Sequence, residues 1–442
     1  MQKHIFTFIV LLFSKSIIAQ IDSLKLDSLM LQLDKHQKAM VSVALSERGQ
    51  LIYQRTIGYA DVEKKQRANV FTPYRIGSIS KMFTAVMTLQ LIEEKKLALN
   101  TTLNTFYPTL PNASKITIEQ LLSHRSGLEN FTANENYLSY HTQPKTEQEL
   151  ISMFEKGKTD FEPDAMHSYS NTNYVLLSFI LEKITKKSYV DLLRIRICAK
   201  ANLGDTYVGG QINAEKNEAL SYEYENNTWV KSAETDMSIP RGAGNIVSTT
   251  HDLSSFIEAL FDGKLITQQS LTKMLDLKDG YGLGIIRIPF GKNWFYGHNG
   301  GIDGFQSMLA YNQEKKATIC ILGNGYNYPM NTIAIALLSA YYGKPFAIPS
   351  FEQKTISLDK LKNFDGVYNN EKLGVKITIK DDNGTLTAQA TGQGAFPLEK
   401  VNELSYKFEA AKLEITFIKD TDGGIRSFNL KQGGMDLLFN RE

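Results

Sequence analysis

Ser78 and Lys81 are side chains that could together carry out nucleophilic chemistry. Residues three apart in a helix lie on one face, about one turn from each other, and this pair begins a long apolar segment. A serine hydroxyl is a weak nucleophile at neutral pH and needs a base beside it. Lysine can serve only if its pKa falls from about 10.4 to near 7, roughly 4 kcal/mol against the charged form. Burial or a nearby positive charge can produce that shift, so the pair indicates acyl transfer at a serine.

The spacing alone is weak, because Ser270–Lys273 and Ser357–Lys360 match it as well. The surroundings of Ser78 set it apart. Residues 82–92 leave almost no polar face, as is typical of a buried helix. The first turn of a helix also offers unpaired N–H groups and a partial positive charge.

A second candidate is Tyr169-Ser-Asn171. A tyrosine can relay a proton between nucleophile and leaving group, and an asparagine amide can bind a carbonyl and orient a lysine. Tyr-x-Asn recurs at 224–226 and 368–370, so the spacing is again weak. A helix N-cap at 170–172 is the structural alternative, and both interpretations can hold at once.

The third candidate is His298-Asn-Gly300-Gly301, which contains the one His-x-Gly of the chain. Glycines let a strand approach a substrate closely, and a backbone N–H there could complete an oxyanion hole. The alternative is a glycine-rich turn with a structural histidine. The seven histidines form no His-x-x-x-His pair, so we expect no metal or other cofactor. Single histidines such as His124 and His251 are expected to be loop or cap residues.

In this chain order the three motifs resemble those of the serine β-lactamase and penicillin-binding-protein superfamily. The similarity is to the branch with class C β-lactamases, D,D-carboxypeptidases, D-aminopeptidases and family VIII esterases. Segments 121–128, 242–253 and 281–284 also look like this family, and the resemblance covers about residues 35–345.

The resemblance implies a role for each motif residue. Ser78 would be the acylated nucleophile and Lys81 its base. Tyr169 would relay the proton to the leaving group and help to activate the deacylating water. Asn171 would bind substrate and orient Lys81.

On the other side of the implied site, His298 stands where many relatives carry lysine. The N–H groups of Ser78 and Gly301 would form the oxyanion hole, next to Gly300. Because histidine is mostly neutral above about pH 6.5, this departure disfavours efficient β-lactam hydrolysis and fits esterases and peptidases. Asp164 is a second departure, at a position where relatives often have glycine.

The elements around these motifs indicate an α/β (α+β) protein. Residues 41–57 and 305–322 have the pattern of two β-hairpins, whereas 98–235 is mainly helical. Amphipathic or apolar helices are expected at 21–38 and 331–342. The pattern predicts an antiparallel sheet flanked by helices, with an inserted helical lobe. The resemblance implies that this is a β-lactamase/transpeptidase-like fold.

A composition change at 343–349 precedes evenly spaced, alternating strands. This pattern predicts a small all-β barrel or sandwich. The stretch resembles the lipocalin-like barrels found after such domains, which implies the barrel. The expected organisation is a signal peptide at 1–20, a hydrolase domain at 21–348 and a barrel domain at 349–442.

The first residues combine a basic start with a short apolar run, which is typical of a secretory signal peptide. An uncleaved anchor is the alternative. We therefore expect a periplasmic or secreted protein without a stable membrane span after cleavage. Cys198 and Cys320 could pair, although Cys320 lies in an apolar run that favours a buried thiol.

The net charge of +2, from 49 Lys and Arg against 47 Asp and Glu, gives no indication of nucleic-acid binding. The predicted function is an exported serine hydrolase that acts through an acyl-enzyme on an ester or amide, of the esterase or D-amino-acid peptidase or carboxypeptidase type. The partner would be a small-molecule or peptide acyl substrate, such as one derived from peptidoglycan. The alternatives are a weakly active β-lactamase or a non-catalytic penicillin-binding sensor that uses the barrel for interaction.

Overall fold

The computed structural model describes residues 21–351, 363–371, 375–382, 385–391, 395–408, 411, 413–432 and 435–442. The chain divides into two compact units, Met1–Ser350 and Phe351–Glu442. The predicted signal peptide and the Ser357–Lys360 match lie outside the described residues.

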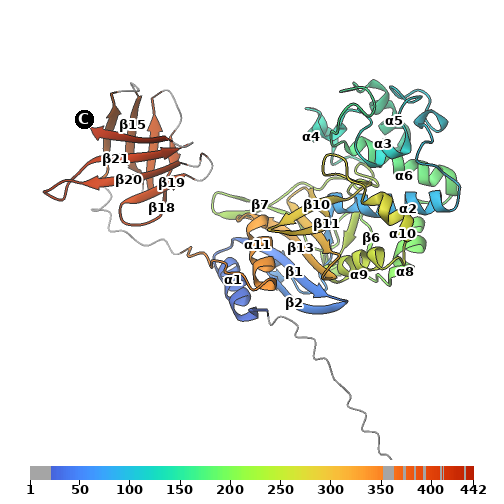
Figure 1. Ribbon diagram of the computed structural model, residues 1–442, viewed down its shortest axis with the longest axis horizontal. Helices are drawn as coiled ribbons and strands as arrows, with labels where there is room; N and C mark the ends of the chain where they lie inside the picture. The colour runs from blue at the N-terminus through green and yellow to red at the C-terminus, as the bar shows by residue number, and fades with distance from the viewer. Residues whose placement is uncertain are drawn as a thin grey trace, which may run out of the picture. The chain divides into compact units, whose positions relative to one another are not determined.

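An antiparallel sheet forms the centre of the first unit (Figure 1). Its order is β10-β11-β12-β13-β1-β2, so strands from both ends of the unit meet at the β13–β1 pair. The predicted hairpins are β1–β2 and β12–β13. The strands are β1 (Ala39–Glu47), β2 (Gln50–Ile57), β10 (Ile286–Phe290), β11 (Asn293–Ile302), β12 (Phe305–Asn312) and β13 (Ala317–Tyr326).

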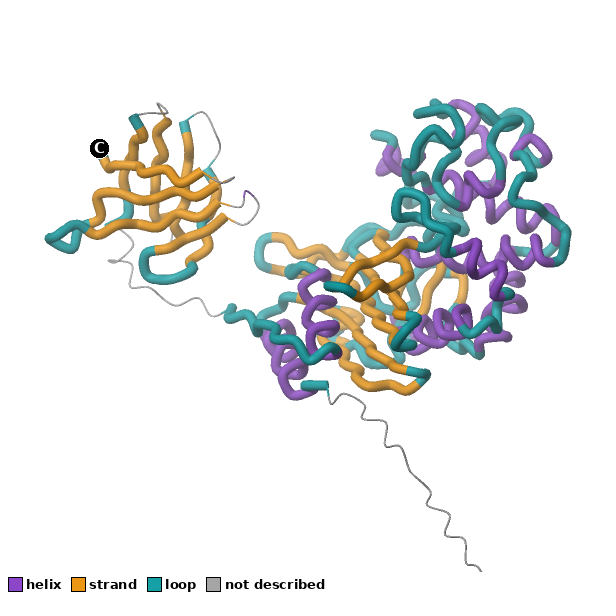
Figure 2. Tube along the Cα trace, viewed as in Figure 1, coloured by secondary structure: helices purple, strands orange, loops and turns teal. Residues whose placement is uncertain are grey.

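Helices pack on both faces of this sheet, as Figures 1 and 2 show. β1 and β13 are therefore buried along almost their whole length. α1 (Ser23–Lys35) buries Leu26, Leu29 and Leu33, three to four residues apart as one helical face requires. The other helices that contact the sheet are α9 (Thr250–Phe261) and α11 (Met330–Tyr341), and α10 (Gln268–Met274) follows α9 in the chain.

A mainly helical lobe is inserted between β2 and β10, and α2 (Ser80–Glu93) joins it to the sheet. α2 is buried on nearly all sides, as its apolar sequence predicts. The remaining helical segments are η1 (Gly77–Ile79), η2 (Leu103–Thr105), α3 (Ile118–Leu122), η3 (Phe131–Ala133), α4 (Tyr137–Tyr140), α5 (Glu147–Lys156), α6 (Asn171–Thr185), α7 (Tyr189–Leu193), η4 (Arg194–Cys198), α8 (Ala199–Ala201) and η5 (Ala214–Lys216). The short strands are β3 (Tyr59–Asp61), β4 (Gln66–Arg67), β5 (Tyr74–Arg75), β6 (Tyr207–Val208), β7 (Tyr222–Glu225), β8 (Thr228–Lys231) and β9 (Ile246–Ser248).

The second unit is a nearly closed antiparallel barrel (Figure 2). Alternate residues point inwards, and aromatic rings such as Tyr368, Phe417 and Phe428 pack together there. The interior is thus a filled core. The strands are β14 (Gly366–Asn370), β15 (Val375–Asp382), β16 (Thr385–Ala390), β17 (Phe396–Pro397), β18 (Glu399–Lys400), β19 (Ser405–Phe408), β20 (Leu413–Lys419), β21 (Ile425–Gln432) and β22 (Met435–Arg441).

Cys198 and Cys320 are both buried and free, so no disulfide joins them. Across the described ranges, the helices are too short or too polar for any of them to cross a membrane.

Candidate active site

Ser78 lies in η1, the turn that leads from β5 into α2. Two hydrogen bonds hold Ile76, just before this turn. Its N–H donates to the Ile246 carbonyl, and its own carbonyl accepts from Ser307 Oγ of β12 at 2.8 Å. The turn is therefore fixed to the sheet, and α2 begins in a defined position beside β11.

Lys81 is fully buried and has three hydrogen-bond partners. Its Nζ lies 3.0 Å from Ser78 Oγ, 2.8 Å from Asn171 Oδ1 and 2.8 Å from the carbonyl oxygen of Ala243. Burial holds the pKa of Lys81 well below its ordinary value. The amine is thereby favoured over the ammonium ion.

The three partners of Lys81 also define where its lone pair points. A neutral amine has two hydrogens, and the oxygens of Asn171 and Ala243 can only accept. Both hydrogens are therefore directed to those two oxygens. The lone pair remains for the third partner, the hydroxyl of Ser78, which then donates its proton to Lys81. This is the arrangement that a general base for a serine nucleophile requires.

Tyr169 contacts the same serine from the other side. Its hydroxyl donates to Ser78 Oγ at 2.8 Å, and burial raises its pKa, so the phenol stays protonated. Lys81 Nζ lies 4.8 Å from the centre of the Tyr169 ring. A positive charge formed on Lys81 is stabilised there by the aromatic face.

Asn171 is oriented by the helical lobe. Its Nδ2 donates to Thr132 Oγ1 at 2.8 Å, and its backbone N–H donates to Asn130 Oδ1. The amide oxygen consequently faces Lys81. Ser170 is the N-cap residue of α6, but its hydroxyl donates to the carbonyl of Glu129 instead of capping the helix. Ser170 therefore occupies the N-cap position, as the structural alternative predicted, but its side chain does not cap the helix.

The backbones of η1 and β11 meet closely at two glycines. Gly77 has a φ of +50°, and a Cβ on it would lie 2.7 Å from the nitrogen of Gly301. A Cβ on Gly300 would lie 2.1 Å from the carbonyl oxygen of Ile76. Side chains are therefore excluded at both positions, and this contact brings the Gly301 amide beside the start of η1, next to Ser78.

A buried ion pair joins the same two segments. Arg75, three residues before Ser78, donates to Asp303 Oδ2 at 2.9 Å, two residues after Gly301. Both side chains are only 2 % exposed. Because the pair is buried and further hydrogen-bonded through Thr235, it fixes the spacing of the two segments that would form the oxyanion hole.

His298 lies on β11 and is buried, and its ring nitrogens form hydrogen bonds with groups other than Ser78. Its Nε2 is 3.0 Å from the Tyr281 hydroxyl, and its Nδ1 is 2.5 Å from the carbonyl oxygen of Asn299. Burial and the nearby Lys81 lower the pKa of His298 to about 3. The ring is therefore neutral at physiological pH.

Two residues beside this site were not among the predicted site residues. His124 lies in the turn after α3, as predicted, but it is also fully buried, with its ring centre 4.3 Å from that of Tyr169. Tyr281 is buried between His124 and His298. Both lie in segments that resemble the family, but that signal assigns no role to either residue.

The other motif matches lie elsewhere. Ser270 and Lys273 are on α10, Tyr224-Glu-Asn226 is in the β7–β8 hairpin, and Tyr368-Asn-Asn370 is in the barrel. Among the matches that the structure describes, the tertiary fold therefore brings one Ser-x-x-Lys and one Tyr-x-Asn together.

Asp164 has a φ of +69°, a conformation that favours glycine. Arg125 holds it there, since its Nε donates to Asp164 Oδ1 at 2.6 Å and its Nη2 to the Asp164 carbonyl at 2.7 Å. Arg125 also pairs with Asp279. This clamp fixes the segments that lead to Tyr169 and Tyr281.

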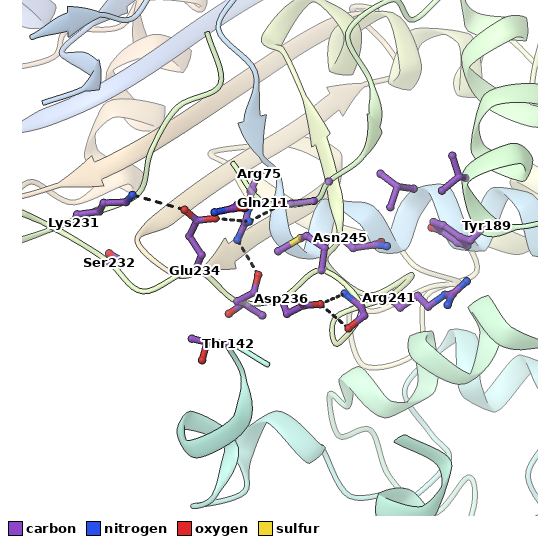
Figure 3. Close-up of a pocket in the computed structure, with 17 residues that line it drawn as sticks. Arg75, Thr142, Tyr189, Gln211, Lys231, Ser232, Glu234, Asp236, Arg241 and Asn245 are labelled. Carbon is purple, nitrogen blue, oxygen red and sulfur yellow. Dashed lines mark hydrogen bonds and ion pairs between the residues drawn. The ribbon is translucent and has the colours of Figure 1, made fainter. Parts of the chain in front are cut away.

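A cavity of about 780 Å³ is lined in part by residues of segment 231–241 (Figure 3). Charged side chains in its wall pair with one another, since Arg75 contacts Glu234 at 3.3 Å and Lys231 lies 3.8 Å from the same carboxylate. Among the described residues that line this cavity, Ser78 and Lys81 do not occur.

Across all the residues that the structure describes, no three His, Cys, Asp or Glu residues are placed to hold a metal ion.

The fold and the Ser78–Lys81–Tyr169 arrangement define a serine acyl-transfer protein. The family model described as Beta-lactamase matches residues 26–341, so the chain belongs to the β-lactamase family. It is 26% identical over 433 residues to penicillin-binding protein 4* of Bacillus subtilis. The aligned region covers 91% of this chain and 95% of that protein.

Two further relatives carry names that describe their activity. A teichoic acid D-alanine hydrolase of Staphylococcus aureus is 25% identical, over 67% of this chain and 74% of that protein. The crystal structure of D-amino acid amidase from Ochrobactrum anthropi SV3 superposes with a TM-score of 0.65 and 28% identity, over 72% of this chain and 99% of that one. These findings confirm the predicted superfamily, the fold class and the serine hydrolase assignment.

Proposed function

We propose that the protein is an exported serine hydrolase that forms an acyl-enzyme at Ser78 and cleaves amides or esters of D-amino acids. The observation that carries the acylation step is the geometry at Lys81, where two carbonyl oxygens take the amine hydrogens and the lone pair faces the serine hydroxyl. Export rests on the basic and apolar start of the sequence.

The reaction begins when Ser78 Oγ attacks the substrate carbonyl while its proton moves to Lys81 Nζ. The carbonyl oxygen becomes an oxyanion that the N–H groups of Ser78 and Gly301 stabilise. The proton then passes to the leaving amine or alcohol through Tyr169, whose hydroxyl bridges to Ser78. The bond to the leaving group breaks, and water later hydrolyses the acyl ester to release the acid and restore Ser78.

Labelling of the full chain with a fluorescent fluorophosphonate or penicillin tests the acylation step. We expect one adduct on Ser78, located by mass spectrometry, and no adduct in Ser78→Ala. Ser270→Ala is the matched control, because Ser270 belongs to the other described Ser-x-x-Lys pair, and it should label like the wild type. Equal labelling of Ser78→Ala at another residue would refute the proposal.

The proposed substrate class has two sources of support. Two relatives are named for D-alanine and D-amino acid hydrolysis. In addition, the neutral His298 supplies no positive charge for a free substrate carboxylate. We therefore expect D-alanine amides and esters to be cleaved with a kcat/KM at least about tenfold above that for D-alanyl-D-alanine with a free carboxylate.

A matched substrate panel measures this preference. It compares D-alanyl-D-alanine with its C-terminal amide, and D-alanine p-nitroanilide with the L-isomer. A higher kcat/KM for the free dipeptide, or equal rates for both stereoisomers, would contradict the substrate class but leave the acylation step standing.

A further inference from the structure

A chain of hydrogen bonds connects the Tyr169 motif to the His298 motif through residues that the reaction itself does not use. It begins at Ser170, whose backbone N–H donates to His124 Nδ1 at 3.1 Å. His124 Nε2 lies 3.1 Å from the Tyr281 hydroxyl, which lies 3.0 Å from His298 Nε2. The chain ends at the carbonyl oxygen of Asn299.

The two ends of this chain determine the direction of every bond in it. A backbone N–H can only donate, so His124 Nδ1 carries no hydrogen and the proton of the neutral ring is on Nε2. A backbone carbonyl can only accept, so the neutral His298 ring carries its proton on Nδ1, and its Nε2 must accept. The Tyr281 hydroxyl satisfies both histidines, since it accepts from His124 and donates to His298.

Burial favours this neutral arrangement. His124 is fully buried and His298 is only 5 % exposed. Desolvation lowers the pKa of both rings. A second proton on either histidine would remove an acceptor from the chain, so the bonds hold only while both rings are neutral.

The chain acts on residues that contact the reacting atoms. The His124 ring packs against the Tyr169 ring, and Ser168, on the other side of Tyr169, donates its N–H to the His124 carbonyl. At the other end, His298 belongs to the strand that carries Gly300 and Gly301. A single series of hydrogen bonds thus holds both Tyr169 in the helical lobe and β11, with Gly300 and Gly301, in the sheet.

We propose that Tyr281 is a positioning residue. It lies at the centre of the hydrogen-bond chain from His124 to His298, and through this chain it holds Tyr169 and β11 in the relative position that acylation requires. This inference rests on the proposed function for its kinetic test, whereas its spectroscopic test does not. His298 acts within this chain, with both ring nitrogens engaged by the protein.

The spectroscopic test uses the full-length wild-type chain with ¹⁵N-labelled histidine at pH 7. Two-bond ¹H–¹⁵N correlation spectra distinguish the two neutral tautomers. We expect the Nε2–H form for His124 and the Nδ1–H form for His298, with signals assigned by their loss in His124→Asn and His298→Asn. The opposite tautomer, or a charged ring, at either residue would overturn the inference even if the enzyme proves inactive.

The kinetic test compares Tyr281→Phe with Tyr53→Phe. Tyr53 is also buried and hydrogen-bonded, to Asp27, but belongs to the α1–β2 contact. Both variants lose one hydroxyl, so a general loss of stability affects both. We expect about a tenfold fall in kcat with little change in KM for Tyr281→Phe alone, together with a mixture of tautomers at His298. An unchanged kcat in folded Tyr281→Phe would overturn the positioning role.

Discussion

Lys81 is fully buried, and its amine must lose its proton before it can act as a base. Lys81→Met keeps the length of the side chain but removes the base. General-base assistance contributes 10²–10⁴-fold, so we expect acylation of the variant to be slower by about 10³-fold. Stopped-flow measurement with a fluorogenic ester determines this rate. A fall of less than tenfold would show that another group accepts the Ser78 proton.

The same substitution should change how stability depends on pH. The pKa of Lys81 is lower in the folded than in the unfolded chain, so between these two values the unfolded state binds the additional proton. Unfolding is therefore favoured as the pH falls below about 10.4. Relative to Lys81→Met, the wild type should lose up to about 1.4 kcal/mol of unfolding free energy per pH unit in that range.

Denaturant titrations at several pH values measure this difference, and the exposed Lys273→Met is the matched control. The control should show no such trend. A pH-independent difference between the wild type and Lys81→Met would mean that Lys81 keeps its ordinary pKa.

Gly300 and Gly301 should differ sharply in their tolerance of a methyl group. A Cβ on Gly300 would overlap the carbonyl of Ile76, whereas a Cβ on Gly301 meets no atom nearer than 3.9 Å among those around it. Gly300→Ala must displace β11 from η1, so we expect a loss of acylation of about 10²-fold or more, comparable to the loss of one oxyanion donor. Gly301→Ala retains its N–H and should stay within about threefold of the wild type. The reverse order of the two activities would contradict the oxyanion geometry.

At the scale of elements, the segment before Tyr169 depends on a strained residue. Asp164 has a positive φ, a conformation that costs a non-glycine residue roughly 1–2 kcal/mol. Asp164→Ala loses the carboxylate contact with Arg125 and keeps the strain, whereas Asp164→Gly loses the same contact and removes the strain. We expect Asp164→Gly to be more stable than Asp164→Ala by about 1 kcal/mol in urea denaturation. Equal stabilities would show that the loop relaxes when the aspartate is removed.

The main hairpins and helices were predictable because each has a local sequence signal of its own. The hairpins β1–β2 and β12–β13 alternate or carry turn residues, and α2 is apolar on every side. The residues of the site were predictable only as motifs, since Ser270–Lys273 has the same spacing as Ser78–Lys81. His124 and Tyr281 could not be given roles, because their roles depend on contacts between residues 157 positions apart in the chain.

At the scale of the whole molecule, the two units have separate hydrophobic cores in the described parts of the chain. We therefore expect two transitions in differential scanning calorimetry of the full chain. A covalent adduct at Ser78 should raise the midpoint of one transition, because it binds only the folded state of one unit. The unmodified chain and inhibitor-treated Ser78→Ala are the controls. A shift of both midpoints would show that the units unfold together.

The two free thiols have a practical consequence for labelling. Burial raises the pKa of Cys198 to about 11 and that of Cys320 still further, and only a thiolate reacts with maleimides at a useful rate. The native chain should therefore remain unmodified at neutral pH while folded. A single cysteine placed at a surface position of either unit would then accept a fluorophore or spin label selectively, without prior removal of the native cysteines.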